Sequence, residues 1–81
     1  METVASKSEI FREAGYAYNF DRMMYFNREA KKAFSIEFVE DHSESELQRC
    51  IGEQTEGTEW RFYSNSRLPE AVRRELENTL R

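Results

Sequence analysis

Two side chains in this sequence could together support nucleophilic chemistry, a cysteine thiol and a histidine imidazole. Cys50 is the single cysteine and His42 the single histidine among the 81 residues. Leu47, Cys50 and Ile51 stand at positions i, i+3 and i+4, which predicts one apolar face of a helix. A cysteine on such a face is typically a small buried hydrophobic residue without an activating base. The sequence therefore indicates no catalytic residues.

Acidic residues around the histidine form the one group that resembles a metal site. Glu40, Asp41 and Glu44 flank His42, but the spacing matches neither a calcium-binding loop nor two histidines one helical turn apart. Carboxylates placed just before a helix more often complement its dipole. The three glycines lie too far apart to form a phosphate-binding loop. We expect no metal site and no bound cofactor.

The elements that would position these side chains follow from helix caps and from the spacing of apolar residues. Ser6 to Glu9 matches the S-x-x-E capping box, and Gly15 suits the left-handed residue that ends a helix. Residues 16–26 are rich in aromatic side chains that begin by alternating with small or polar ones, which predicts a strand. Asp21 and Arg22 interrupt this run, either as a bulge in one long strand or as a turn between two strands. The bulge is favoured, because Asp-Arg lacks the glycine that two-residue turns prefer.

Residues 33–40 have the clearest strand pattern in the chain. Phe34, Ile36 and Phe38 alternate with residues that would point to the opposite face. A polar segment separates this run from the aromatic one before it. We therefore expect residues 33–40 to pair antiparallel with residues 22–27 and to bury the three alternating side chains.

Three elements follow in the second half of the chain. Ser43 and Glu46 form a second capping box and predict a helix that Gly52 closes. Residues 59–64 predict a third strand, and a last helix begins near Pro69, with proline at its first position. The apolar stripe of that helix repeats every four residues, at Leu68, Val72, Leu76 and Leu80.

The order α-β-β-α-β-α predicts an α+β fold in which two to three helices pack on one face of a three-stranded antiparallel sheet. A chain of this length suits one small domain, residues 1–81. The apolar runs are far shorter than the roughly 18 residues of a membrane span. The first residues lack the pattern of a secretion signal, and a single cysteine fits a reducing compartment. We expect a cytoplasmic protein with no membrane contact.

Charge is distributed unevenly along the chain. The formal net charge is −4, from 12 basic and 16 acidic residues. Residues 37–59 hold eight acidic residues against Arg49 alone, whereas the segments on either side are mildly basic. We call residues 37–59 the acidic block. A field of this kind steers association, so the acidic block favours a basic partner.

The favoured function is a non-enzymatic protein interaction or regulatory module. It would bind a protein partner, or a second copy in a symmetric homodimer, because aromatic and apolar residues exceed what the expected core needs. The residues expected on an open sheet face are Met23, Tyr25, Val39 and Tyr63. In the alternative arrangement, Ile10 and Phe11 of the first helix cover that face.

Two other functions compete with it. A nucleic-acid-binding domain would use basic residues interleaved with aromatic ones, Arg28, Lys31, Lys32, Arg73 and Arg74. The negative net charge argues against this second function. A small enzyme or ligand binder would use Tyr25, Glu37 and Arg61. No motif in the sequence selects a known family.

Overall fold

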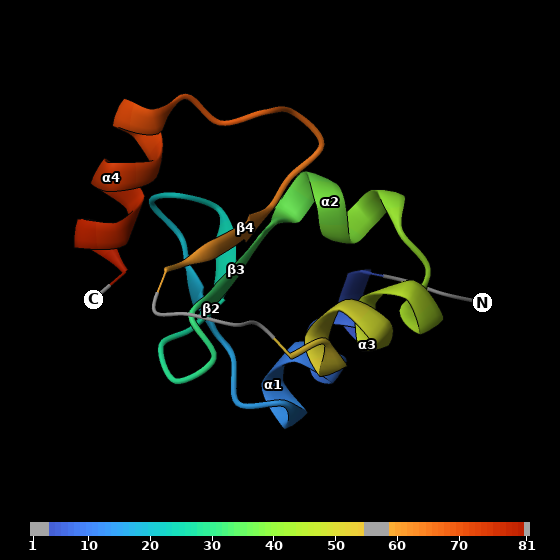
Figure 1. Ribbon diagram of the computed structural model, residues 1–81. Coiled ribbons are helices and arrows are strands. Elements are labelled where there is room, and N and C mark those ends of the chain that lie inside the picture. The colour runs from blue at the N-terminus through green and yellow to red at the C-terminus, as the bar shows by residue number, and fades with distance from the viewer. Residues whose placement is uncertain (1–3, 55–58, 81) are drawn as a thin grey trace.

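The fold is α+β, with one mixed sheet between two layers of helices. The computed structural model describes residues 4–54 and 59–80. Figure 1 shows α4 on one side of the sheet and α1 and α3 on the other. In chain order the elements are α1 (Val4–Glu13), β1 (Ala17–Asn19), β2 (Met24–Asn27), β3 (Lys32–Ser35), α2 (Ile36–Asp41), α3 (Glu44–Gly52), β4 (Arg61–Tyr63) and α4 (Glu70–Thr79).

The sheet has four strands in the order β1-β2-β3-β4. The first three form an antiparallel meander, and β4 joins β3 in parallel, with Ala33 opposite Phe62. The predicted antiparallel pairing of residues 33–40 with residues 22–27 is confirmed as far as Ser35, because Tyr25 stands opposite Phe34 and Met24 opposite Ser35. The prediction of three strands, all antiparallel, is wrong. The chain returns to β3 through α2 and α3, and such a crossover brings the next strand in parallel.

The interruption at Asp21 and Arg22 is a turn between two strands, so the favoured bulge is wrong. Asn19 Oδ1 accepts a hydrogen bond of 2.9 Å from the Arg22 N–H, and Met23 then adopts a φ of 54°. The next hairpin repeats this design. Asn27 Oδ1 accepts from the Ala30 N–H at 3.0 Å, and the following Lys31 has a φ of 55°. An asparagine thus replaces the missing glycine by holding a four-residue loop from its first end.

The strand expected over residues 33–40 stops at Ser35, and the rest becomes α2. Ser35 is the N-cap of α2, and its hydroxyl accepts a hydrogen bond of 3.2 Å from the Phe38 N–H. Phe34 is fully buried, whereas Ile36 and Phe38 are half-buried. The alternating residues therefore span the end of β3 and the start of α2. The helix begins here because the Ser35 side chain offers the backbone a hydrogen-bond partner outside the sheet.

Gly15 ends α1 as predicted, in the left-handed conformation with a φ of 89°. The Tyr16 N–H donates to the Phe11 carbonyl at 2.8 Å, and the Gly15 N–H donates to the Arg12 carbonyl at 3.1 Å. This pair of bonds is the Schellman motif, whose apolar contact is supplied by the rings of Phe11 and Tyr16, 5.3 Å apart. Ser6 lies inside α1 and not at its N-cap, so the first capping box is wrong.

Among the caps of the later helices, the N-cap of α3 matches the prediction, whereas Gly52 and Pro69 do not. Ser43 is the N-cap of α3, as predicted, and accepts from the Glu46 N–H at 3.2 Å. Gly52 is the last residue of α3 and has no left-handed φ, so its predicted closing role is wrong. Pro69 is the N-cap of α4, one position before the first helical residue.

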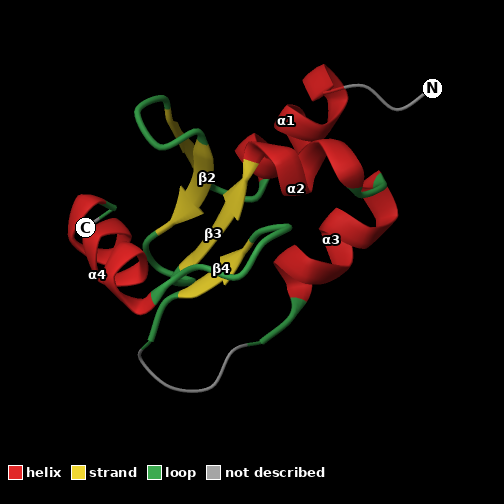
Figure 2. Cartoon of the chain, turned by 90° about the horizontal axis from the view of Figure 1, so that it is seen from above, coloured by secondary structure: helices red, strands yellow, loops and turns green. Residues whose placement is uncertain are grey.

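One face of the sheet packs beneath three helices, as Figure 2 shows. The buried cluster on this face contains Phe11, Tyr16, Phe34, Val39 and Leu47. Phe11 of α1 stacks on Tyr25 with ring centroids 4.8 Å apart, and Phe34 stacks on Tyr63 at 4.3 Å. The alternative in which the first helix covers the aromatic sheet face is therefore confirmed.

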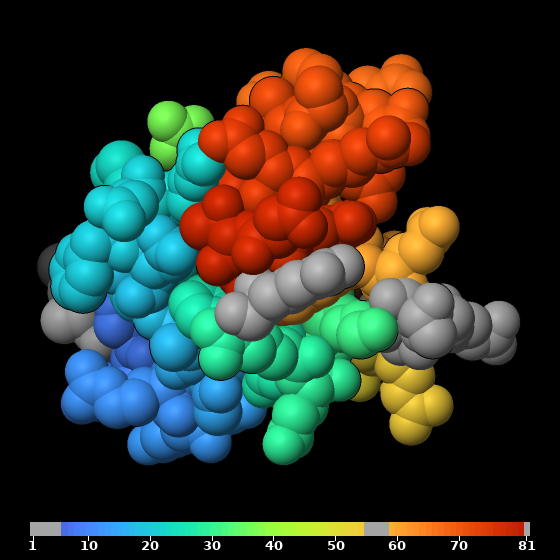
Figure 3. Space-filling model, turned by 90° about the vertical axis from the view of Figure 1, so that its left-hand side faces the viewer, coloured from blue at the N-terminus to red at the C-terminus, as the bar shows by residue number. Residues whose placement is uncertain are grey.

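The opposite face packs against α4, which corrects the prediction that the two later helices share one face. Its buried cluster contains Met24, Ala33, Trp60, Leu76 and Leu80. Figure 3 shows α4, in orange and red, lying against the blue-green hairpin. Neighbouring residues of β2, β3 and β4 alternate between the two clusters, as the pleat requires. Both faces are apolar, and each therefore needs a covering layer.

Candidate interaction surface

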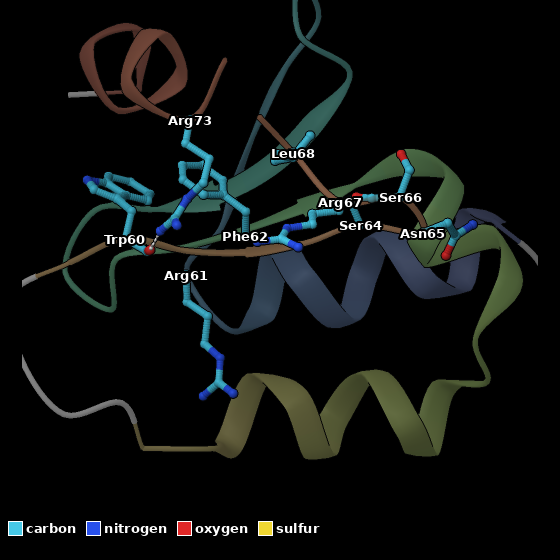
Figure 4. A pocket seen from close by; sticks show the side chains of 9 residues that line it. All are labelled: Trp60, Arg61, Phe62, Ser64, Asn65, Ser66, Arg67, Leu68 and Arg73. Carbon is cyan, nitrogen blue, oxygen red and sulfur yellow. Dashed lines mark hydrogen bonds between the residues drawn. The ribbon is translucent and has the colours of Figure 1, made fainter. Parts of the chain in front are cut away.

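The chain between β4 and α4 separates two hollows on the surface. The first, which we call the arginine pocket, has a volume of about 410 Å³. Its lining residues, drawn in Figure 4, are Trp60, Arg61, Phe62, Ser64, Asn65, Ser66, Arg67, Leu68 and Arg73. None of them is acidic, although the chain as a whole carries a net charge of −4. The pocket is therefore a local concentration of positive charge.

Two of the three guanidinium groups lie over β4. Arg73 descends from α4, donates a hydrogen bond of 3.3 Å to the Trp60 carbonyl, and lies 5.7 Å from the ring centre of Phe62. Arg67 reaches toward Phe62 from the connecting segment (Figure 4). Arg61 points away from them, and its Nη1 lies 3.9 Å from Oε2 of Glu53, just after α3. Within the described ranges, neither Arg67 nor Arg73 forms an ion pair.

The second hollow, which we call the apolar groove, has a volume of about 330 Å³. It lies between the β1–β2 turn, the start of α2 and the inner face of α4. Its apolar lining residues are Met23, Met24, Ile36, Leu68, Val72 and Leu76. Arg22, Glu37 and residues 64–66 add polar groups to its lining. Leu68 and residues 64–66 line both hollows, so a bound segment could extend from one to the other.

Large apolar side chains are exposed close to this groove. Met23 is 55% exposed and Val72 is 37% exposed. Phe20 is 82% exposed but does not line the groove, and its ring packs edge-on against Tyr18. Met23 and Val72 line the groove from opposite elements. Met23 lies in the β1–β2 turn and has a left-handed backbone, with a φ of 54°. The groove thus combines a partly buried floor with exposed apolar sides.

The four residues predicted to share an open sheet face do not share one. Val39 is fully buried on α2, and Tyr25 and Tyr63 pack into the cluster beneath the helices. Burial and a 3.1 Å hydrogen bond to Glu53 raise the pKa of Tyr63 to about 12. Met23 alone of the four is exposed. The prediction placed them together because it assigned Val39 to a strand.

The basic residues of the nucleic-acid hypothesis are separated in the same way. Lys32 is buried, and its Nζ donates to the carbonyls of Cys50, Ile51 and Glu53, so it caps the end of α3. Burial lowers the pKa of Lys32. Arg28 donates to the Leu80 carbonyl at 2.8 Å. Arg74 pairs with Glu70 at 3.1 Å, while Arg73 alone of the set lines the arginine pocket. Lys31 lies in the β2–β3 turn.

The residues of the enzyme hypothesis also lie in different surroundings. The Tyr25 hydroxyl bonds to Ser8 of α1, whereas Glu37 lines the apolar groove and Arg61 the arginine pocket. His42 stacks on Phe38 with ring centroids 3.8 Å apart, and its Nδ1 lies 2.8 Å from the Phe38 carbonyl oxygen. Cys50 packs against the cluster beneath the helices, and burial raises the pKa of its thiol.

Sequence analysis missed both hollows. Trp60 and Phe62 lie on the strand predicted over residues 59–64, whereas Arg73 was named only among the basic residues of the nucleic-acid hypothesis. It lies one position after Val72 and three before Leu76, so it borders the apolar stripe and reaches back to β4. A long side chain at such a border can cover apolar surface with its stem while its charge stays accessible. Arg67, in the connecting segment, had no periodic pattern to indicate its position.

Comparison with models of protein families, with characterised proteins and with solved structures finds no match to this chain. Across residues 4–54 and 59–80, no helix is long and apolar enough to cross a bilayer. The same part of the chain contains no group of three His, Cys, Asp or Glu side chains placed to hold a metal ion. The site must therefore be interpreted from its own geometry.

Proposed function

We propose that this protein is a non-enzymatic, cytoplasmic interaction module that binds a protein partner at the apolar groove. The single observation that carries the proposal is the pair Met23 and Val72, both exposed and both lining one groove. Exposed apolar residues that gather in a hollow mark binding sites more often than residues scattered singly. The single cysteine supports the reducing compartment.

The groove has the composition of an interface centre. Buried Met24 and Leu76 provide an apolar floor, and methionine adapts its shape to different partners. Polar groups from Arg22, Glu37 and residues 64–66 surround it, which is the usual arrangement of an apolar centre and a polar rim. Its volume suits one or two bulky apolar side chains of an inserted segment.

The acidic block supports a preference within this class of partner. Glu37, Glu40 and Asp41 lie exposed along α2, which begins beside the groove. A partner segment with a basic residue next to its apolar anchor would meet this charge. Of the acidic block, residues 55–58 lie outside the described residues. We therefore propose a partner segment that combines a bulky apolar residue with a basic neighbour.

A selection from a library of displayed random peptides tests the proposal. We expect enriched peptides to share one or two bulky apolar residues and to bind about tenfold or more weakly to Val72→Glu, because a carboxylate would then be desolvated in the groove. Ala71→Glu is the matched control, since Ala71 is the exposed neighbour on α4 and does not line the groove. Failure to enrich any peptide, or equal binding to both variants, would reject the proposal.

A further inference from the structure

The arginine pocket is a second site, distinct in its chemistry from the apolar groove. Its two guanidinium groups over β4 belong to residues without a carboxylate partner in the described part of the chain. Other arginines show the contrast, because Arg22 pairs with Glu75 and Arg74 with Glu70. Arginine side chains that gather without a counter-charge provide paired donors for a carboxylate or a phosphate.

We propose that the arginine pocket binds the carboxylate side chains of an acidic peptide segment, with Arg67 and Arg73 as the residues that recognise them. Arg73 is held in place by the Trp60 carbonyl and the Phe62 ring. A guanidinium that is already positioned loses less conformational entropy when it binds an anion. Arg67 is exposed and supplies the second charge from the opposite wall.

The aromatic residues of the pocket favour a peptide over a nucleic acid. Single-stranded nucleic acids bind chiefly by stacking their bases on open aromatic faces. Trp60 and Phe62 stack on each other, with ring centroids 6.2 Å apart and planes within 15°. Arg73 covers the Phe62 ring, and Trp60 is only 9% exposed. The ring faces are therefore already occupied, and the guanidinium groups are what remains for a ligand.

The extent of the positive charge points the same way. A nucleic acid needs a track of cations along its backbone. Around this pocket the other candidates are engaged elsewhere, since Lys32 is buried against α3 and Arg28 holds the end of α4. Two available guanidinium groups suit one or two carboxylates. The pocket volume of about 410 Å³ suits an extended segment of that kind.

The protein carries its own reporter for this site. Trp60 is the single tryptophan and lines the pocket, so we expect its fluorescence to respond to occupancy. The probe is a hexaglutamate peptide with blocked ends, titrated at low ionic strength. We expect a saturable change in tryptophan fluorescence that weakens with added salt. A hexaglutamine peptide of the same length should produce none.

Variants assign the effect to the pocket. Arg67→Gln should weaken hexaglutamate binding about tenfold, because one charge-assisted contact is lost. Arg73→Gln should weaken it as strongly, but Arg67 carries the test because its exposed side chain has no role in packing. Arg74→Gln is the matched control, since Arg74 lies next to Arg73 on α4 but outside the pocket. Far-UV circular dichroism checks that each variant is folded.

Four outcomes would overturn the proposal. One is the absence of a saturable signal with hexaglutamate, and another is equal binding by Arg67→Gln and Arg74→Gln. The third is tighter, Arg67-dependent binding of a mixed-sequence single-stranded oligonucleotide, which would assign the pocket to nucleic acid. The fourth is an equal response to inorganic phosphate at equal concentration, which would assign the pocket to small anions. The proposed function at the groove is tested separately, because Arg67 does not line the groove.

Discussion

The ammonium group of Lys32 lies 2.9 Å from the carbonyl oxygen of Cys50, at the C-terminal end of α3. The same group also donates to the carbonyls of Ile51 and Glu53. The last carbonyls of a helix have no partners within it, and the helix dipole makes this end negative. A buried lysine from the central strand β3 thus attaches α3 to the sheet. Lys7 of α1 makes a similar contact with α2, through a 3.1 Å bond to the Glu40 carbonyl that joins these two helices.

Lys32→Met should lower the free energy of unfolding by about 1.5–3 kcal/mol, because the methionine fills similar space but leaves the carbonyls of α3 without a donor. Arg49→Met is the control, since Arg49 lies exposed in the last turn of the same helix. It should change stability by less than about 0.5 kcal/mol. Urea denaturation measures both. Similar small effects for the two variants would show that the three bonds contribute little.

Tyr16→Phe should stabilise the protein, because the Tyr16 hydroxyl is buried and has no hydrogen-bond partner among the described residues. Removing it relieves an unsatisfied polar group, and we expect a gain of about 1 kcal/mol in urea denaturation at pH 7. Tyr63→Phe is the contrasting variant, since its hydroxyl donates to Glu53 at 3.1 Å. That change should cost about 1 kcal/mol. A loss of stability in Tyr16→Phe would contradict the packing described for this ring.

The same tyrosine determines part of the response to alkaline pH. Burial raises the pKa of Tyr16 from 10.0 to about 12, so the folded state keeps a proton that the unfolded state loses. The proton-linked part of the free energy of unfolding is fully present below pH 10, where Tyr16 is protonated in both states. It is lost as the pH rises from 10 toward 12, because the unfolded state ionises first. Tyr16→Phe should therefore lose less stability across this range than the parent protein.

Sequence patterns predicted helix ends correctly where a single residue type determines the backbone conformation. Gly15 and Ser43 are examples, because a left-handed C-cap and a hydroxyl N-cap each depend on a single side chain. Such patterns failed where two local preferences compete. Phe34, Ile36 and Phe38 alternate as a strand would, but the Ser35 hydroxyl begins a helix within the same run. The parallel β4 and the separate face for α4 depend on how distant segments meet, which periodicity does not specify.

The candidate site was harder to predict from the sequence than the fold. Met23 was singled out correctly as an exposed apolar residue, but its neighbours in the groove come from α2 and α4. Arg67, between β4 and α4, and Arg73, on α4, line one pocket only because the chain turns back over β4 (Figure 4). Such a pocket exists only once the elements are packed.

Two glycines provide a matched test of backbone conformation. Gly15→Ala should destabilise the protein by about 1–2 kcal/mol, because a residue with a Cβ is strained at a φ of 89°. The added Cβ would meet only Asn27 Nδ2 at an ordinary 3.5 Å, so strain and not a clash is the cause. Gly52→Ala adds a Cβ with no atom within 4 Å. At the end of a helix it should be neutral or slightly stabilising, and equal losses in thermal denaturation would refute this assignment.

Met23→Gly should raise the stability of the protein by up to about 1 kcal/mol, since glycine adopts the observed φ of 54° without strain. Met23→Ala removes nearly the same side chain but keeps the Cβ, so it should not be stabilising. Because Met23 is 55% exposed, the two variants lose similar contacts. Guanidinium denaturation of both separates backbone strain from packing. An identical shift in the two would indicate that the turn is unstrained.

The homodimer predicted from the sequence depended on an open aromatic face, and α1 covers that face. We therefore expect a monomer near 9.7 kDa in sedimentation velocity at micromolar concentration. The apolar groove is the surface that remains for a second copy, and Val72→Glu tests this because Val72 is one of its exposed sides. A dimer that persists in Val72→Glu would place self-association on another surface, such as the edge strand β1. A dimer that this substitution dissociates, while Ala71→Glu leaves it intact, would instead identify the partner of the groove as a second copy of the chain.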